Sequence, residues 1–185
     1  MAEIDDAIER ADREAFTRQP PKTLQARINF LMKQLKTTKA VAAELGVSQR
    51  SVERYRKGER KHPPKAIADR IDDAVRQRWQ PQVRKRRQKQ AAASGGITVE
   101  TRARFGYTAP IGTTDDGRFR RLTVHLPPAY AQRLFDARNT GASDREMRGI
   151  IAEGFKEIYF QDGGGRAMGL SDVTLNDIDY LDLDY

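Results

Sequence analysis

The chain has 185 residues, with 34 Lys and Arg against 26 Asp and Glu, a formal net charge of +8 and no cysteine. The lack of cysteine excludes a disulfide framework, a Cys-ligated zinc or iron–sulfur site and a thiol nucleophile, and it suits a reducing cytoplasm. A mean hydropathy of -0.76, with no apolar run near the roughly 18 to 20 residues of a membrane-spanning helix, predicts a soluble protein that does not enter the membrane.

The charge is distributed unevenly along the chain. Residues 1–96 carry 23 basic and 12 acidic side chains, a net charge of +11, whereas residues 97–185 carry 11 and 14, a net charge of −3. A basic excess of this kind favours a polyanionic partner. We expect a mainly α N-terminal domain with a helix-turn-helix, followed by a small α+β domain of two strands and two helices.

The first 80 residues are predicted to form a helical DNA-binding domain. Apolar residues recur at helical spacing over residues 4–15, 24–35 and 67–75. The segment 38–58 has the pattern of a helix-turn-helix.

Several residues of this segment have a physical role in such a motif. Ala42 is small where the two helices would cross, and Gly46 permits a left-handed turn between them. Ser48 can cap the second helix and Thr38 the first. The shared apolar seam would consist of Val41, Leu45, Val47, Val52 and Tyr55.

The second helix would be a recognition helix whose exposed face enters a DNA groove. Arg and Gln make bidentate contacts with guanine and adenine edges, and basic residues further along would contact phosphates. The candidate DNA-binding residues are Gln49, Arg50, Ser51, Arg54, Arg56 and Lys57. The structural alternative is an ordinary two-helix corner with a solvated basic face.

Residues 81–96 are predicted to be a basic linker. They begin with a run of Arg and Lys and end in small residues and a glycine pair. The alternative is a solvated extension of the preceding helix, because Arg, Lys, Gln and Ala are good helix formers.

Residues 97–162 are predicted to form the α+β domain. Alternating apolar residues indicate strands over 97–105 and 122–126, separated by a long loop, 106–117. Two helices follow, one opening at Pro127-Pro128 and one at a capping box of Ser143 and Glu146. Residues 163–185 have the composition of a Gly-rich and acidic tail.

The order of strand and two helices also resembles that of ribbon-helix-helix proteins. In that arrangement the chain would be a homodimer, and strands of two chains would pair and place Arg121, Thr123 and His125 in a groove. The alternative is that the strand pairs within its own chain.

Motifs for catalysis are scarce in this sequence. It has no Walker-type loop, no nucleophile elbow, no paired catalytic carboxylates on a helix and no His cluster. The segment Thr113-Thr114-Asp115-Asp116 in the long loop offers the best set of hydroxyls and carboxylates.

Four stretches together resemble the telomere-protecting terminal proteins (Tpg type) of linear actinobacterial chromosomes and plasmids. The resemblance covers nearly the whole chain, and its most specific parts are the loop and the acidic ending. The stretches are residues 7–16, residues 41–57, the loop Phe105-Gly106-Tyr107-Thr108-Ala109-Pro110-Ile111-Gly112-Thr113-Thr114-Asp115-Asp116 and the ending Ile178-Asp179-Tyr180-Leu181-Asp182-Leu183-Asp184-Tyr185.

This resemblance implies a protein that is joined through a side-chain hydroxyl to the 5′ end of telomeric DNA, primes end patching and caps the finished end. It assigns the acceptor role to Thr114, with Thr113 as second choice and Tyr107 and Thr108 as weaker ones. The implied partners are a DNA polymerase, which would supply Mg²⁺, and a telomere-associated protein that could contact the acidic tail. The protein would be a substrate rather than an enzyme, binding no cofactor itself, and would reside in the nucleoid at telomeres.

Other hypotheses remain. A non-covalent helix-turn-helix regulator or plasmid-maintenance protein would bind duplex DNA without a nucleotide adduct. Asp115 and Asp116 could help to hold Mg²⁺ or orient the hydroxyl, or they could simply form a turn. A nucleotidyltransferase is disfavoured because the sequence has no metal-binding carboxylate constellation.

Overall fold

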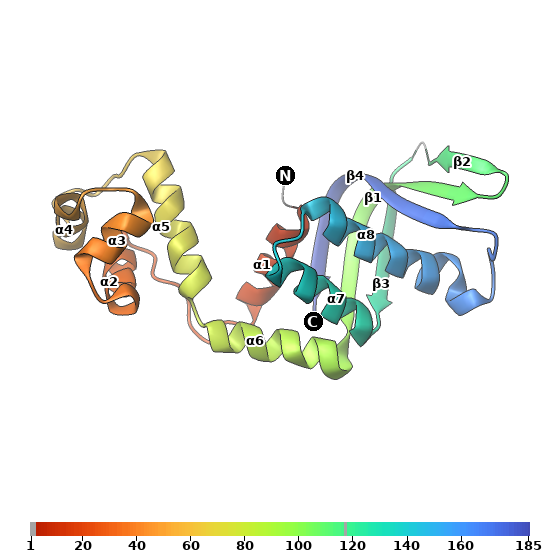
Figure 1. Ribbon diagram of the computed structural model, residues 1–185, viewed down its shortest axis with the longest axis horizontal. Helices are drawn as coiled ribbons and strands as arrows, with labels where there is room; N and C mark the ends of the chain where they lie inside the picture. The colour runs from red at the N-terminus through yellow and green to blue at the C-terminus, as the bar shows by residue number, and fades with distance from the viewer. Residues whose placement is uncertain (1–2, 117) are drawn as a thin grey trace. The chain divides into compact units, whose positions relative to one another are not determined.

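The computed structural model describes residues 3–116 and 118–185. They form two compact units, one of residues 16–81 and one of residues 3–15 together with 82–185, which we call the helical unit and the sheet unit (Figure 1). The helical unit is thus an insertion in the chain of the sheet unit. Over the described residues the chain is of the α+β class, with eight α-helices and one four-stranded antiparallel sheet.

The helical unit contains α2 (Leu24–Leu35), α3 (Thr38–Leu45), α4 (Gln49–Lys57) and α5 (Lys65–Arg78). The hydroxyl of Thr23 caps α2 by accepting a hydrogen bond from the Ala26 amide. Glycines in the left-handed conformation end α3 and α4. The core between the helices consists of Ile28, Leu31, Val41, Ala42, Leu45, Val52, Tyr55, Ile71, Ala74 and Val75.

The sheet unit begins with α1 (Glu3–Glu14). After the helical unit it resumes with α6 (Pro81–Gln90) and the π-helical turn η1 (Ala91–Gly95); the first residue of α6, Pro81, belongs to the helical unit. The chain continues through β1 (Ile97–Ala109), β2 (Gly112–Asp115), β3 (Arg120–Leu126), α7 (Pro128–Asn139) and α8 (Asp144–Gly154). It ends with the short helical segments η2 (Phe155–Phe160) and η3 (Asp162–Gly164) and the strand β4 (Asp172–Asp184).

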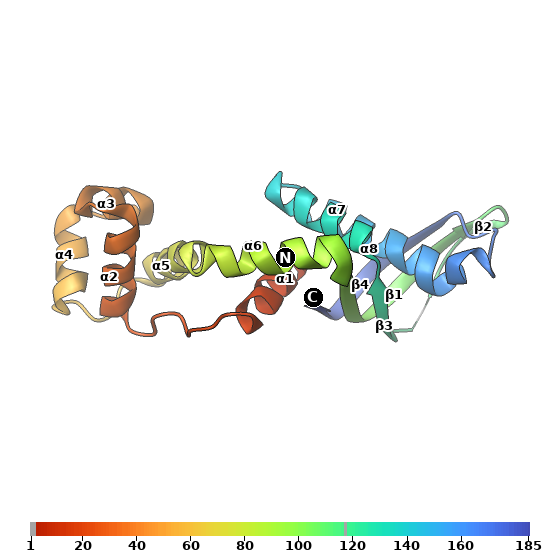
Figure 2. The same ribbon diagram turned by 90° about the horizontal axis from the view of Figure 1, so that it is seen from below.

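β1 is the central strand and is antiparallel to its three neighbours. β3 and β2 pair with successive parts of β1, and β4 pairs with it from Thr98 to Thr108. Figures 1 and 2 show α7 and α8 on one face of the sheet. Side chains alternate between faces, so Val99 is buried in the core whereas Arg102 is exposed and pairs with Asp179 at 2.5 Å.

The first helix belongs to the sheet unit and not to a helical domain of residues 1–80, which differs from our expectation. Ile4 and Ile8 are fully buried in the same core as Val99. The Ile4 amide donates a hydrogen bond to Asp144 Oδ1 at 2.8 Å. Helical periodicity identifies the apolar face of a helix, but it does not identify the surface that covers that face.

A partly buried ionic cluster fastens α1 to α6 and α7. Glu9 accepts hydrogen bonds from Arg84 and Arg138, each at 2.8 Å, and Arg138 reaches Asp5 at 2.6 Å. The fully buried Asp12 accepts a hydrogen bond from the Tyr185 hydroxyl at 2.7 Å. Burial, the Asp12 charge and this hydrogen bond raise the pKa of Tyr185.

Two further segments differ from the expected domain division. The basic residues 81–96 form α6 and η1, so this segment is helical, as in the alternative to a flexible linker. Residues 172–184 form β4 rather than an acidic tail, because Val173 and Leu183 are buried in the core while aspartates alternate with them.

The strand 120–126 pairs within its own chain. Its residues from Arg120 to Leu126 face the segment from Ala103 to Ile97 of β1. This is the intrachain pairing given as the alternative to the ribbon-helix-helix arrangement, in which the strands of two chains would pair at that edge. Arg121, Thr123 and His125 are exposed on the face opposite to the helices.

Candidate functional site

The corner between α3 and α4 is built by a glycine and two caps. Gly46 has a φ of 64°, and a Cβ there would lie 2.3 Å from Nη1 of Arg70. The Ser48 hydroxyl accepts a hydrogen bond from the Ser51 amide and caps α4, as predicted. The cap of α3 is Thr37 rather than Thr38, since its hydroxyl accepts from the Ala40 amide.

The sequence-predicted DNA-binding residues lie together on α4. Gln49, Arg50, Arg54, Arg56 and Lys57 are exposed. Ser51 differs from them because it is half-buried and its hydroxyl lies 3.0 Å from that of Ser48. This contact lies beside the cap of α4.

The charge around α4 is strongly positive. The helical unit, residues 16–81, has 16 Lys and Arg against 6 Asp and Glu, a net charge of +10. Arg54 makes a loose ion pair with Glu59 at 3.8 Å, in which both side chains are about half exposed. Exposed pairs of this kind are worth little, about 0 to 1 kcal/mol, so a phosphate can compete for the guanidinium.

The candidate acceptor residues lie on a β-hairpin. The expected long loop is mostly the end of β1 and the strand β2, joined at Pro110 and Ile111. Thr114 is paired with Tyr107, and Thr113 with Thr108. Both Thr113 and Thr114 are exposed.

The two threonines lie on opposite faces of the hairpin, because neighbouring residues of a strand alternate. The Tyr107 ring packs against Phe160 of η2, with centroids 5.3 Å apart, so Thr114, directly across from Tyr107, lies on the η2 face. Thr113 lies on the other face, and its hydroxyl is 3.2 Å from that of Thr108.

Asp115 shares the face of Thr113 and belongs to a polar cluster over Gly106. Asn176 donates to Asp115 Oδ1 at 2.8 Å, and Thr174 donates to the Asn176 amide oxygen at 2.9 Å. A Cβ on Gly106 would lie 2.4 Å from Thr174 Oγ1 and 2.7 Å from Asp115 Oδ1. The glycine therefore allows β2 and β4 to make polar contact across β1.

Sequence reasoning missed Gly106, Thr174 and Asn176 as parts of this cluster. Thr174 and Asn176 lay in the segment assigned to the tail. The alternation of Val173 and Leu175 with polar residues is the signal of period two that would have predicted a strand there.

Asp116 is engaged by arginines. It pairs closely with Arg120 and at 3.8 Å with Arg118. The hydrogen bond from Arg120 lowers the pKa of Asp116. These pairs join Asp116 to Arg118 and to Arg120 at the start of β3, which favours a structural role for Asp116.

Tyr107 and Thr108 are less accessible candidates than the two threonines of β2. The Tyr107 hydroxyl is buried without a hydrogen-bond partner among the described residues, and burial raises its pKa. Thr108 is half-buried, and its hydroxyl lies 3.2 Å from that of Thr113.

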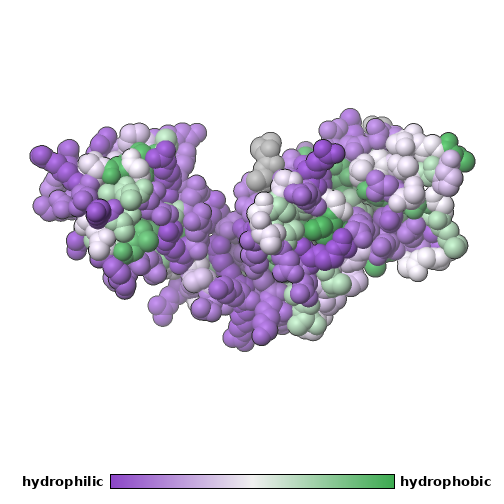
Figure 3. Space-filling view, in the orientation of Figure 1, coloured by the Kyte–Doolittle hydropathy of each residue, from purple (hydrophilic) through white to green (hydrophobic). Residues whose placement is uncertain are grey.

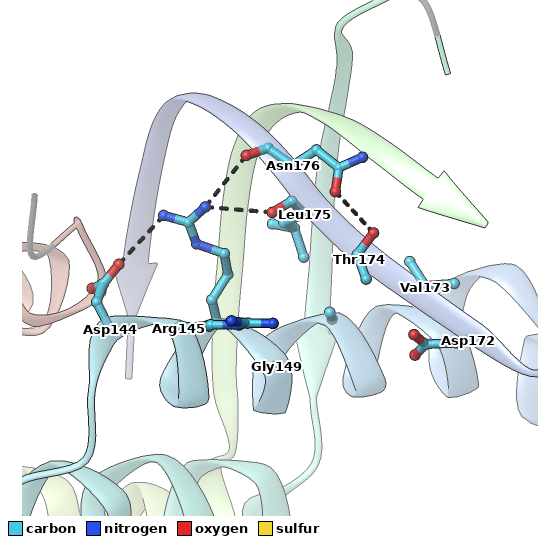
Figure 4. Close-up of a pocket in the computed structure, with 10 residues that line it drawn as sticks. Asp144, Arg145, Gly149, Asp172, Val173, Thr174, Leu175 and Asn176 are labelled. Carbon is cyan, nitrogen blue, oxygen red and sulfur yellow. Dashed lines mark hydrogen bonds and ion pairs between the residues drawn. The ribbon is translucent and has the colours of Figure 1, made fainter. Parts of the chain in front are cut away.

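A groove of about 610 Å³ lies between α8 and β4 (Figure 4). Arg148 donates to the carbonyls of Leu175 and Asn176 at 3.4 and 3.3 Å and pairs with Asp144 at 3.4 Å and Glu3 at 2.7 Å. Arg148 thus fastens β4 to α8 and α1. The residues that line the groove include neither Thr113 nor Thr114.

Residues 3–116 and 118–185 contain no cluster of three or more His, Asp and Glu side chains arranged to hold a metal ion. None of the helices formed by these residues has the length and apolar character needed to cross a bilayer.

We compared the chain with protein-family models, with curated proteins and with solved structures, and none of these comparisons gives a match.

Proposed function

We propose that this protein binds telomeric DNA through α3 and α4 as a helix-turn-helix and becomes covalently joined to a DNA 5′ end through Thr114. In this role it primes the synthesis that patches the ends of a linear replicon, and it caps the finished end. Thr113 is the second candidate. The protein is a substrate of a DNA polymerase, acts in the nucleoid at telomeres, and is recruited there by a telomere-associated protein.

The observation that carries the proposal is the pair of exposed threonines on β2, in the segment that resembles the terminal proteins of linear replicons. An acceptor hydroxyl must enter the active site of another protein, which a projecting hairpin allows. The second support is the separate helical unit, whose net charge of +10 suits a DNA ligand.

The proposed reaction replaces the 3′-hydroxyl of a nucleic-acid primer by a threonine hydroxyl. Thr114 Oγ1 attacks the α-phosphorus of a deoxynucleoside triphosphate, a new P–O bond forms, and the bond to pyrophosphate breaks. The hydroxyl proton passes to a base or to water, and pyrophosphate leaves with Mg²⁺ supplied by the polymerase. The attached nucleotide retains a free 3′-hydroxyl, from which synthesis continues.

Peptide mass spectrometry tests this proposal on protein recovered from nuclease-digested DNA ends of its own host. Trypsin releases the segment from Phe105 to Arg118, which contains all four candidate hydroxyls. We expect a nucleotide on Thr114, whereas an adduct on Thr113, Thr108 or Tyr107 would retain the role and move the site. A fully recovered, unmodified segment from verified ends would refute the covalent role.

The alternative is a non-covalent DNA-binding regulator. The exposed basic face of α4 supports this alternative as well as it supports the covalent role, because binding in a DNA groove needs no hydroxyl that accepts a nucleotide. This alternative predicts sequence-specific duplex binding that persists when Thr113 and Thr114 are both replaced by valine, and no nucleotide adduct in the host.

A further inference from the structure

We propose that the end of the sheet unit formed by Ile111, Tyr159 and Met168, which we call the apolar end patch, is the surface on which the polymerase docks. This inference rests on the proposed function, because it identifies where the partner of the acceptor hairpin binds.

The patch contains all the large hydrophobic side chains that are exposed in the described part of the chain. Ile111 is 100% exposed, Met168 is 83% exposed and Tyr159 is 36% exposed. Figure 3 shows hydrophobic surface at the end of the sheet unit where β2 lies in Figure 1. A cluster of exposed apolar side chains marks an interaction site more often than single exposed residues do.

Contacts between segments distant in sequence hold the patch together. A Cβ on Gly169, next to Met168, would lie 3.8 Å from Pro110 Cδ, next to Ile111. Ser171 is hydrogen-bonded to the Thr108 carbonyl through both its amide and its hydroxyl. The turn of the hairpin and the segment before β4 therefore form one surface.

Tyr159 extends this surface toward Thr114. Its ring packs on Phe160 with centroids 5.0 Å apart, and Phe160 packs on Tyr107 at 5.3 Å. Arg166 donates a hydrogen bond to the Tyr159 carbonyl at 2.7 Å. Tyr107 is the residue directly across from Thr114, so Tyr159 and Thr114 lie on the same face of the hairpin.

The position of Ile111 brings the patch close to the proposed acceptor. Strand residues rise by about 3.3 Å each, so Ile111 lies within about 10 Å of Thr114 along the hairpin. A standard protein interface covers about 800 Å² on each partner, which corresponds to a circle of about 16 Å radius. An enzyme whose interface is centred on Thr114 therefore covers Ile111 and the turn of the hairpin, which is one side of the patch.

The chemistry of the patch favours a protein over a nucleic acid. DNA is bound mainly through its phosphates, by cations. The turn of the hairpin, Pro110-Ile111, carries no charge, whereas Arg166 lies over the Tyr159 ring, 5.9 Å from its centroid. Exposed apolar side chains such as those of Ile111 and Met168 are typical anchors at the centre of a protein interface.

The test uses the full chain and each purified DNA polymerase of its host, with binding measured by surface plasmon resonance and nucleotide transfer measured with labelled deoxynucleoside triphosphates and Mg²⁺. The variant Ile111→Ser with Met168→Ser should raise the Kd for the polymerase about 10- to 100-fold, the loss typical of removing interface anchors. It should raise the KM for the chain and leave kcat unchanged. Since both side chains are exposed, its circular dichroism spectrum should match that of the wild type.

Two controls separate docking from acceptor chemistry. The variant Thr113→Val with Thr114→Val should bind the polymerase with unchanged Kd and accept no nucleotide. Arg145→Ser, which removes an exposed side chain from the groove of Figure 4, should change neither measurement.

The outcomes distinguish the two proposals. Unchanged polymerase binding in Ile111→Ser with Met168→Ser, while nucleotide transfer continues, overturns the patch and retains the acceptor role. Polymerase binding that needs the patch, without transfer to any hydroxyl, supports the patch and overturns the acceptor role. Self-association that disappears in the patch variant, with no polymerase binding by the wild type, would identify the occupant as a second copy of the chain and overturn the inference.

Discussion

Removal of two arginines from α4 should weaken DNA binding in a way that depends on salt. Arg50, Arg54, Arg56 and Lys57 are exposed cations on this helix. Each neutralised phosphate contributes about −0.9 to the slope of log K against log salt concentration. Four such contacts give a slope of about −3.6, and Arg50→Ala with Arg54→Ala should reduce it to about −1.8.

The slopes translate into affinities that can be measured directly. The assay compares binding at about 50 and about 200 mM salt. Over this range a slope of about −3.6 predicts that the wild type loses about 150-fold in affinity, and a slope of about −1.8 predicts that the variant loses about 12-fold. If the arginines contact bases instead, the slope should fall less, and discrimination between DNA sequences should fall by about 1 to 3 kcal/mol per contact.

Fluorescence anisotropy of a labelled telomeric duplex at four salt concentrations measures both the affinity and its salt slope. The matched control is Arg13→Ala with Arg145→Ala, which removes the same charge from exposed positions of the sheet unit. We expect this control to retain the wild-type slope. If the α4 variant keeps both its affinity and its slope, α4 is not the DNA-binding helix.

Three further predictions concern the sheet unit. Arg138→Met leaves Glu9 and Asp12 with fewer partners in a buried setting and should lower the free energy of unfolding by about 3 kcal/mol in urea titrations; unchanged stability would mean that the cluster does not contribute. Gly106→Ala should displace Thr174 or Asp115 and speed amide hydrogen exchange in β2, whereas wild-type exchange rates would show that the cluster tolerates a methyl group. Burial raises the pKa of Tyr107 above its ordinary value of 10.0, so its contribution to stability is present below about pH 10 and is lost as the pH rises through the folded-state pKa. Tyr107→Phe should therefore lose less stability in alkali than the wild type, and equal losses would contradict this reasoning.

The elements with the strongest local signals were predictable from the sequence. The spacing of Leu24, Ile28 and Leu31 predicted α2, and the capping box of Ser143 and Glu146 predicted the start of α8. Such signals lie within one turn of the chain, where propensity and hydrogen bonding act directly. The α+β class is confirmed, but the sheet has four strands and not the expected two, because β2 and β4 lie in segments that were expected to be a loop and a tail.

The assignment of elements to units was not predictable in the same way. Ile4 and Ile8 have the pattern of any amphipathic helix, and their partners lie in a core formed mostly by residues after Ile97. Similarly, the many aspartates give the segment of β4 the composition of a solvated tail, although apolar residues alternate with polar ones along it. Pairing with β1 is a long-range contact that no local pattern specifies.

The candidate hydroxyls show why register matters for function. If residues 106–117 formed an irregular loop, nothing would distinguish the directions of the Thr113 and Thr114 side chains. Because both threonines belong to strand β2, they lie on opposite faces of the hairpin. An adduct on Thr114 would mean that the polymerase approaches from the η2 face, beside Tyr159, and contacts the apolar end patch. An adduct on Thr113 would mean approach from the face that carries Asp115, where a fixed carboxylate could orient the hydroxyl. The identity of the modified threonine therefore also reports the direction from which the partner binds.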